Sequence, residues 1–487
     1  MGGRLPSDRP WGPLPGLRAD RLGAVDRPNE RIVIACCLLL GAATVLIAPA
    51  LGYDAWAWMV WARELTQLSL DTTGGPSWKP LPVLVSAPFA WIDGLAPFLW
   101  LALIRGAALY SLWLAGRCAA RLAGAPAAAV AFAFAAFALL VSTDLPRTAL
   151  YGASEPLLVV FVLAAVLAFL SDRPLIALGL IATGGLIRPE LWLVGGLYGL
   201  WCLYSVPSRR PLTVALIIAP AIVWSALDWL GSGGLAQGAE TAQSTTPTTA
   251  ANAASPSLEV LTRFGDSVIL PVLLLAAVAV VIAWRRGNRQ LLLIALLAVG
   301  WVVVVALMAE LGFTGARRYL IGPAALTCVL AGVGAGWLIA AVPLRFARYA
   351  AASALAILFA VFGLFVLRTD ARLLSVARLA AKQSDELSGA VARVGGRDVV
   401  VAVGKPAVNP YAQTGLAWKL NLPLSGVQGT WASTEARPNW QPPAIVFVAP
   451  ARLAGPKPAL GPSVRSRKLS SYGRYGRWQV FRAYPYR

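Results

Sequence analysis

Long apolar segments alternate with short polar ones along most of the chain, and this pattern constrains the fold more than any other feature. A helix needs roughly 20 apolar residues to cross a bilayer core of about 30 Å, and most of the segments approach that length. The short alternating segments of a transmembrane barrel do not occur. We therefore predict an α-helical polytopic membrane protein with about eleven transmembrane helices. The segments cover residues 32–52, 96–115, 127–143, 155–170, 174–187, 190–204, 211–230, 267–284, 290–309, 319–340 and 349–367.

The composition agrees with this class and limits the chemistry. Of the residues, 58% are hydrophobic and 13% are charged, whereas soluble domains carry roughly 25% charged residues. Histidine is absent, which excludes a Ser-His-Asp relay and histidine-bound zinc. The five cysteines lie in or beside apolar segments without metal-ligand spacing, so we interpret them as small core hydrophobes. Acid–base chemistry must therefore come from Asp, Glu, Tyr, Lys or Arg.

The chain divides into three parts. Residues 1–31 are rich in Pro, Gly and Arg and are predicted to be a disordered cytoplasmic N-terminal tail. Residues 32–367 contain the predicted transmembrane helices. Residues 368–487 have the pattern of a small α/β domain, because short runs of Val, Ile and Phe alternate there with a helical segment. The elements expected in it are strands at 398–403, 444–448 and 478–483 and a helix at 411–420.

Two regions between apolar segments are expected on the outer side of the membrane. Residues 53–95 form a first outer loop with half-apolar stretches, which favours helices lying in the interface. Residues 231–266 are rich in Gly, Ala, Ser and Thr and are predicted to be a mobile outer loop. Pro189 breaks an apolar run and predicts a helical hairpin that crosses only partly. Because tryptophan prefers the headgroup layer, we interpret five of them as interfacial anchors: Trp56, Trp58, Trp61, Trp78 and Trp91.

The distribution of arginine predicts the orientation. Cytoplasmic loops carry an excess of Lys and Arg, and with the N-terminus in the cytoplasm every short inner loop contains arginine while almost all acids lie outside. An odd number of spans then places the C-terminal domain outside the cell membrane. The arginines of the inner loops are Arg117, Arg121, Arg173, Arg209, Arg210, Arg285, Arg286, Arg289, Arg345 and Arg348.

The C-terminal domain is strongly basic. Residues 368–487 contain 18 Lys and Arg against 5 acids. A basic surface near a membrane attracts anionic headgroups or acidic polymer. We therefore expect anionic lipids or polymer as its partners, and no nucleic acid, because no nucleic-acid motif occurs and the domain is expected outside the cell.

Asp54 lies just beyond the first apolar segment, at the predicted boundary between membrane and water. A carboxylate there can receive a polar substrate from water while it faces a lipid-borne one. Aspartate is also favoured as a helix N-cap, and a helix is expected to begin at Ala55. Asp54 is therefore a candidate general base or a helix cap.

Other ionisable residues lie at the ends of apolar segments, where charge is costly and usually marks a site or an ion pair. Arg188 and Glu190 flank the break at Pro189, so that Arg188 is a candidate ligand of phosphate or a partner of Glu190. Arg317 and Arg318 begin a segment. Their guanidinium groups either bind phosphate oxygens in pairs or extend to the headgroups.

Lys79 and Glu155 complete this set of candidates. Lys79 lies in the first outer loop and either reaches a phosphate or anchors the loop. Glu155 begins the segment 155–170. A negative charge at that position stabilises the helix N-terminus by itself, and it is also placed to line the cavity that the other candidates form.

Several of these residues belong to short motifs that occur in a recognisable order. Together the motifs resemble the GT-C superfamily of integral-membrane glycosyltransferases, which includes mannosyl-, arabinosyl- and aminoarabinosyltransferases. The resemblance covers roughly residues 32–367. The motifs are Asp54, Trp78-Lys79-Pro80-Leu81-Pro82, Tyr151-Gly152-Ala153-Ser154-Glu155, Leu186-Ile187-Arg188-Pro189-Glu190 and Arg317-Arg318-Tyr319-Leu320-Ile321-Gly322-Pro323.

The resemblance implies inverting transfer of a sugar from a polyprenyl-phosphate donor to a cell-envelope glycan, lipid or protein on the outer face, as in cell-wall biogenesis. It implies Asp54 as the general base. The donor phosphate would be held by Lys79, Arg188, Arg317 and Arg318. The cavity would be lined by Tyr53, Trp78, Glu155, Glu190 and Tyr319.

The chain departs from the superfamily pattern at two places, and two other functions stay open. Asp54 is followed by Ala55 where relatives often carry a second acid, and Trp78-Lys79 stands where many carry histidine, so no metal ligand is assigned and a divalent cation is left open. A lipid-linked sugar flippase would predict repeated broken helices, whereas one break, at Pro189, is evident. A non-catalytic envelope scaffold would need only the basic C-terminal domain.

Overall fold

The computed structural model describes residues 29–92, 94–141, 144–243, 248–429, 443–448 and 469–484. The predicted disordered tail lies outside these residues except at its end. The chain is a polytopic helical membrane protein with a small C-terminal sheet, as predicted, and each of the eleven apolar segments contains a helix. These helices are α1 (Glu30–Val45), α4 (Ala96–Ala123), α5 (Ala128–Val141), α7 (Glu155–Phe169), α8 (Pro174–Gly185), α9 (Glu190–Ser205), α10 (Arg210–Ser232), α13 (Leu270–Arg286), α14 (Arg289–Glu310), α15 (Ile321–Ala341) and α16 (Arg345–Val394).

The helices differ in length, and their lengths bear on how they cross the membrane. Within the described residues, four helical stretches are long and apolar enough to span a bilayer, or five if a pair bent by 98° counts as one. That pair is α12 (Pro256–Ser267) with α13. The other apolar helices, including α5, α7 and α8, are shorter. The number of complete spans stays a prediction.

Helix α15 forms the centre of the bundle and packs against α4, α5 and α13. In an apolar stretch of 18 residues within Arg317–Ala341, 83% is buried inside the protein. Gly332 and Gly336 permit the close approach of α5. A Cβ atom on Gly332 would lie 2.6 Å from the carbonyl oxygen of Ala131 in that helix, and one on Gly336 would lie 2.8 Å from that of Ala127, just before it. Small residues at helix contacts are the usual means of packing in a membrane, where dispersion replaces the hydrophobic effect.

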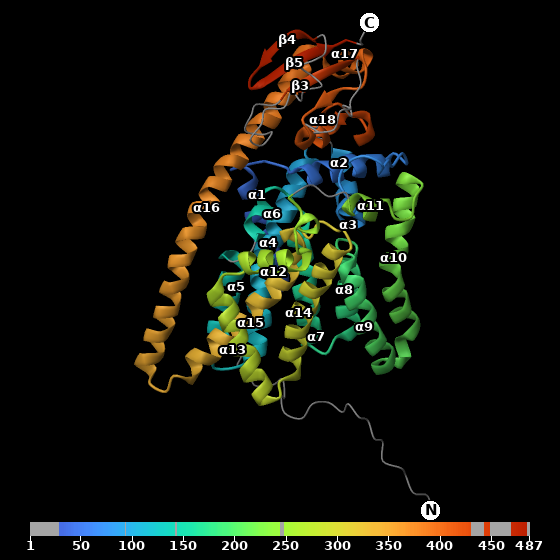
Figure 1. Cartoon of the computed structure of the whole chain (residues 1–487). Coiled ribbons are helices and arrows are strands. Elements are labelled where there is room, and N and C mark those ends of the chain that lie inside the picture. The colour runs from blue at the N-terminus through green and yellow to red at the C-terminus, as the bar shows by residue number, and fades with distance from the viewer. Residues whose placement is uncertain are drawn as a thin grey trace, which may run out of the picture.

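The end of the bundle nearest the C-terminal sheet, which the arginine distribution predicts to be the outer end, carries short helices that lie across it (Figure 1). The first outer loop folds into α2 (Tyr53–Thr66), α3 (Pro80–Ser86) and η2 (Ala87–Ile92). Two further short elements, α6 (Leu145–Leu150) and η5 (Arg317–Leu320), precede α7 and α15. The first residues of α2, α7, α9 and η5 carry most of the candidate site.

Three of the predicted tryptophan anchors are buried instead. Trp58, Trp61 and Trp78 are 0–1% exposed. Trp58 packs edge-on against Trp100, and Trp61 packs edge-on against Trp78 with ring centroids 5.3 Å apart. The interfacial assignment is therefore wrong for these three, because the helices of the first outer loop fold back on one another. Trp91 is 80% exposed, as an anchor would be.

The second outer region is partly helical. It contains α11 (Gln237–Gln243), η4 (Ala250–Asn252) and α12. Outside this region, the short η3 (Pro207–Arg209) precedes α10. The region is tied to its surroundings through Gly238, whose N–H donates to Asp228 and whose carbonyl oxygen accepts from the Ser77 hydroxyl. Ala250 donates to the carbonyl of Thr314. Mobility of this loop stays a prediction, but its described part has defined contacts with the first outer loop.

The C-terminal domain contains a five-stranded sheet in the order β2-β1-β3-β5-β4. β1 runs parallel to β2 and β3, whereas β5 is antiparallel to β3 and β4. The strands expected at 444–448 and 478–483 and the helix expected within 411–420 are present. The elements are α17 (Gly396–Val403), β1 (Ala407–Val408), η6 (Pro410–Ala412), α18 (Gln413–Lys419), η7 (Leu424–Gly426), β2 (Gln428–Gly429), β3 (Ala444–Val448), β4 (Leu469–Tyr475) and β5 (Trp478–Ala483).

The predicted strand at 398–403 is wrong, because this segment is the helix α17. Gly395 and Gly396 have φ of 113° and 78°, a left-handed conformation that ends α16 and starts a new helix. Val400 is fully buried while Val399 and Val401 are about 40% exposed. The valine run therefore buries one face of a helix rather than both faces of a strand.

Helix α16 links the membrane domain to this sheet without interruption. Its 50 residues extend about 75 Å at roughly 1.5 Å per residue, along one side of the molecule (Figure 1). The apolar segment 349–367 is the part of α16 in the bundle, and the helix continues past residue 368 into the C-terminal domain. The arginine-bearing junctions α9–α10, α13–α14 and α15–α16 lie at the opposite end of the bundle from the sheet (Figure 1).

Candidate active site

Asp54 lies in the first turn of α2 and forms an ion pair with Arg318 of η5. The two residues are 264 positions apart in the sequence. The helix begins at Tyr53 with Gly52 as the N-cap, so the prediction of a helix start at Ala55, with Asp54 as its cap, is wrong. The side chains are 19% exposed for Asp54 and 38% exposed for Arg318. The pair is thus within reach of solvent at the outer end of the bundle.

A second, deeper group of charges surrounds Glu155, the first residue of α7. Its Oε1 lies 2.7 Å from Nη2 of Arg188 and 3.5 Å from Nζ of Lys79. All three side chains are at most 7% exposed. Lys79 also donates to the hydroxyl of Ser154 at 3.3 Å. Buried charges cost several kcal/mol each unless they are paired. Here one oxygen, Oε1 of Glu155, is paired with both cations.

Tyr319 joins the two groups. The Arg188 guanidinium carbon lies 4.1 Å from the centroid of the Tyr319 ring, and that of Arg318 lies 6.0 Å from it. The ring is 6% exposed, and its hydroxyl accepts a hydrogen bond from Thr314 at 3.0 Å. Helix α2, the loop before α3, α7, the α8–α9 turn and η5 therefore meet at one place.

This cluster carries an excess of positive charge. Among the ion-paired side chains, three cations, Lys79, Arg188 and Arg318, face two carboxylates, Asp54 and Glu155, which leaves one positive charge. The buried Glu190 is not counted, because it forms no ion pair with these cations. Burial lowers the pKa of Lys79 to about 8, although Glu155 raises it in part. An anionic group that enters the cluster would neutralise the excess charge and restore the full charge of Lys79.

Several buried polar atoms without a hydrogen-bond partner belong to residues of this cluster or to their neighbours in the sequence. Such atoms are rare in native proteins and point to a bound water, ion or ligand. Within the described part of the chain they include three with donor character, in Trp58, Trp78 and Arg188, and two acceptors, in Glu155 and Glu190. A polar ligand with both donors and acceptors, such as a sugar phosphate, suits this set.

The other predicted site residues have different surroundings. Arg317 lies 2.6 Å from Asp266 in a half-exposed ion pair and does not join the cluster. Glu190 is buried two residues after Arg188, but the predicted Arg188–Glu190 pair is wrong, because Arg188 binds Glu155. Tyr53 is half-buried, and its carbonyl oxygen accepts a hydrogen bond from Thr414. Trp78 is buried against Trp61.

The structure adds two residues that the sequence interpretation missed. Ser154 binds Lys79, and its place immediately before a helix that starts with Glu155 was a usable signal. The ring of Trp58 lies 5.4 Å from Nζ of Lys79. Trp58 follows Asp54 by four positions, a spacing that places both on one face of a helix and was a usable signal.

The donor set does not fit a divalent metal ion. Among the residues that the structure describes, no three acidic or cysteine side chains converge. Asp54 and Glu155 instead each face cationic side chains of the protein. We therefore derive no chemical step through a metal.

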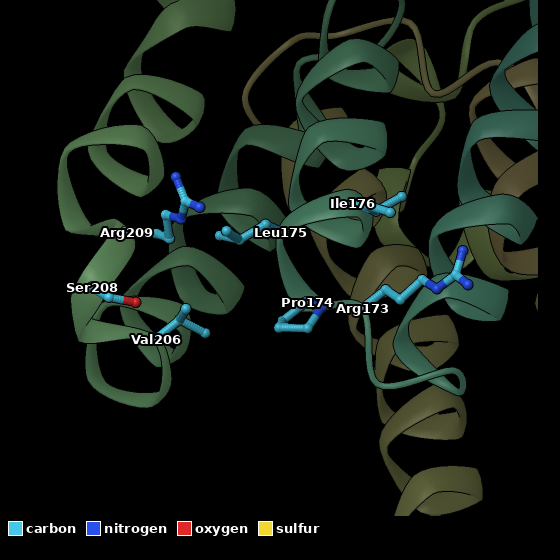
Figure 2. A pocket seen from close by; sticks show the side chains of 7 residues that line it. All are labelled: Arg173, Pro174, Leu175, Ile176, Val206, Ser208 and Arg209. Carbon is cyan, nitrogen blue, oxygen red and sulfur yellow. The ribbon is translucent and has the colours of Figure 1, made fainter. Parts of the chain in front are cut away.

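A pocket of about 380 Å³ lies elsewhere, between the start of α8 and the α9–α10 turn. Its polar lining consists of Arg173, Ser208 and Arg209, and Figure 2 shows the two arginines on opposite sides of the pocket. It contains no carboxylate that could act as a base. The pocket therefore offers no candidate base, unlike the cluster around Asp54 and Glu155.

Comparison with known proteins supports the fold. No protein-family model and no curated protein matches the chain. Among solved structures, ArnT from Cupriavidus metallidurans bound to undecaprenyl phosphate is similar, with a TM-score of 0.54 and 14% identity over 93% of this chain and 97% of that chain. The apo state of the same protein gives a TM-score of 0.54 and 15% identity over the same shares.

A TM-score above one half over nearly the whole of both chains establishes a shared fold, including the C-terminal domain. The resemblance predicted from the motifs is thereby confirmed at the level of the fold. The chain has the same fold as this ArnT structure.

Proposed function

We propose that the chain is an inverting glycosyltransferase that moves a sugar from a polyprenyl-phosphate donor to a cell-envelope acceptor on the outer face of the membrane. The observation that carries the proposal is the cluster of Asp54 and Arg318 with the buried Lys79–Glu155–Arg188 group. This cluster lies at the outer end of a GT-C fold. The solved neighbour, ArnT, is described as bound to undecaprenyl phosphate, which supports a polyprenyl-phosphate donor.

In the proposed reaction, the acceptor hydroxyl attacks the anomeric carbon while the bond from that carbon to the phosphate oxygen breaks. Asp54 accepts the hydroxyl proton, and the polyprenyl phosphate leaves with the electron pair of the broken bond. Negative charge then develops on the phosphate. Lys79, Arg188 and Arg318 are placed to stabilise it, because preorganised cations in a site that excludes water act more strongly than in solution.

Glu155 has a structural role in this account. It holds Lys79 and Arg188 in the buried part of the site when no phosphate is bound. An arriving phosphate competes for the same two cations. The cations therefore need no large movement to change partner, which favours binding at a site that is already formed.

We further propose that these protein cations take the place of a metal ion in stabilising the phosphate. Treatment of the purified protein with EDTA is then expected to leave the transfer rate unchanged. A loss of activity that Mg²⁺ or Mn²⁺ restores would contradict this part of the proposal.

The function is tested by incubating purified protein with labelled sugars on polyprenyl phosphates and, as a comparison, with the same sugars on nucleotides. Transfer from at least one polyprenyl phosphate and from no nucleotide is expected. If the protein instead moves the labelled lipid across vesicle bilayers without transferring the sugar, it is a flippase. If the folded protein neither transfers sugar nor moves the lipid, the non-catalytic envelope scaffold becomes the favoured function.

A further inference from the structure

The C-terminal domain does not stand apart from the candidate site but packs directly on α2, the helix that carries Asp54. Helix α18 lies against α2 in the structure (Figure 1). The opposite side of α2 contacts the bundle, where Gly52 donates to the carbonyl of Tyr151 at 2.8 Å and Trp58 packs on Trp100. Helix α2 is therefore held between the membrane domain and the C-terminal domain.

At its first turn, α2 is bound by Thr414. The Thr414 side chain is fully buried, and its hydroxyl donates to the carbonyl oxygen of Tyr53 at 2.8 Å. Tyr53 is the residue immediately before Asp54. A hydrogen bond to this carbonyl fixes the peptide plane from which the Asp54 side chain projects.

Beside this hydrogen bond, two aromatic rings pack between α2 and α18. The rings of Trp56 and Trp418 lie 6.3 Å apart, and Nζ of Lys419 lies 5.5 Å from the Trp56 ring. Gly415 of α18 also lies beside the Trp56 ring, at a distance where a Cβ atom would make ordinary van der Waals contact at 3.5 Å. The first turn of α2 thus has little freedom to shift away from α18.

At its last turn, α2 is bound again. Nη2 of Arg63 donates to the carbonyl oxygen of Leu422 at 2.9 Å, and Nη1 donates to that of Trp418 at 3.4 Å. Beyond the helix, the Ser425 hydroxyl donates to Asp71. The C-terminal domain therefore holds both ends of the helix.

From these contacts we infer that Thr414 is a positioning residue for the Asp54 carboxylate, so that the C-terminal domain completes the active site of the membrane domain. The inference rests on the proposed function. Asp54 reaches the acceptor only from the first turn of α2, and a misplacement of about 1 Å in a reacting group can cost about a hundredfold in rate. The donor phosphate is assigned to Lys79, Arg188 and Arg318, which lie outside α2, so loss of the Thr414 hydroxyl is expected to lower the rate of the chemical step more than the affinity for the donor.

The test compares Thr414→Val, which removes the hydroxyl at nearly constant volume, with Thr414→Ser, which retains it. In the full-length protein, Thr414→Val is expected to lower kcat about tenfold while KM for the polyprenyl-phosphate donor stays within about twofold, and Thr414→Ser is expected to restore most of kcat. Thr262→Val is the matched control, because that hydroxyl is exposed and donates only within its own helix. A kcat of Thr414→Val equal to that of Thr262→Val would overturn the inference.

Hydrogen exchange supplies a readout that does not depend on activity. The amides of residues 53–58 are expected to exchange faster in Thr414→Val than in the wild type, with no change in the buried part of α15. Unchanged exchange in this segment would count against the inference whether or not the protein transfers sugar. If exchange rises and the wild type transfers no sugar from any donor, the proposed function fails while the contact itself is supported.

Discussion

At the scale of single residues, the site is governed by buried charges that satisfy one another. Glu155 and its two cations are almost fully buried, whereas the Asp54–Arg318 pair remains partly open to solvent. This difference separates their roles. In the proposed reaction, the buried group sets the charge of the site, and the partly open pair presents the Asp54 carboxylate to the acceptor.

Two adjacent arginines provide a matched test of the phosphate site. Arg318 faces Asp54, while its neighbour Arg317 binds Asp266 at the surface. Arg318→Lys is expected to lower kcat/KM for the donor by roughly tenfold or more, because lysine keeps the charge but loses the paired donors of the guanidinium fork. Arg317→Lys is expected to stay within about twofold of the wild type. Equal losses for both variants would contradict the different roles assigned to them.

The charge state of Lys79 predicts a dependence on pH. Because burial lowers the pKa of Lys79 to about 8, the free enzyme loses this positive charge as the pH rises through that value. KM for the donor is therefore expected to increase above pH 8. Arginine stays charged throughout this range, so Lys79→Arg is expected to retain a flat KM between pH 7 and pH 9. A wild-type KM that does not change with pH would show that Lys79 does not contribute its charge to binding.

At the scale of elements, α2 carries a buried acid, Glu64, in addition to the candidate base Asp54. Glu64 is 4% exposed near the end of this helix, with one oxygen accepting from the N–H of Asp71 and the other lacking a partner among the described residues. Burial raises the pKa of Glu64 to about 7, and the hydrogen bond from Asp71 lowers it only in part. The folded state therefore prefers a protonated Glu64.

This preference predicts how stability depends on pH. A carboxyl group whose pKa is raised on folding stabilises the protein most at low pH, and its contribution is lost as the pH rises from the ordinary value of 4.5 through about 7. Glu64→Gln imitates the protonated form. At pH 8.5 it is expected to increase the free energy of unfolding by an amount on the order of 3 kcal/mol, seen as a higher unfolding temperature. At pH 5 it is expected to have little effect. The same change at both pH values would mean that Glu64 is not neutral when buried.

The nearby Asp71 behaves in the opposite way. Burial alone would raise its pKa, but hydrogen bonds from Ser425 and Thr73 lower it below the ordinary value. Asp71 thus stays ionised and keeps its bond to the C-terminal domain at neutral pH. The two acids at this end of α2 differ because one receives several donors and the other receives one.

At the scale of the whole molecule, the sequence predicts the class of fold but not the contacts that build the site. The apolar segments set the positions of the helices, and the motifs around Asp54 and Arg318 indicate the superfamily fold. The pairing of Arg188 with Glu155 rather than Glu190 was not predictable, because it depends on how α7 meets the α8–α9 turn. Local spacing favoured the nearer acid, and tertiary packing selected the more distant one.

The same limit explains the tryptophans and the C-terminal domain. A tryptophan-rich stretch after an apolar segment fits an interfacial position, but Trp58 is buried against Trp100 of α4 and Trp61 is buried against Trp78 of the first outer loop. Likewise, residues 368–487 could be read as a separate domain, whereas α16 joins them to the bundle and α18 binds α2. These contacts join residues more than 300 positions apart in the chain, and no local pattern reports them.

The most direct test of the central claim is the rate of sugar transfer by Asp54→Asn, measured in single turnover with the donor that the wild type uses. Asp172→Asn is the matched control, because Asp172 is exposed in a turn with positive φ, which asparagine also adopts readily. Asp54→Asn is expected to lose at least about a hundredfold in rate with donor binding retained, while Asp172→Asn keeps the wild-type rate. Transfer by a folded Asp54→Asn protein at the rate of Asp172→Asn would contradict the account.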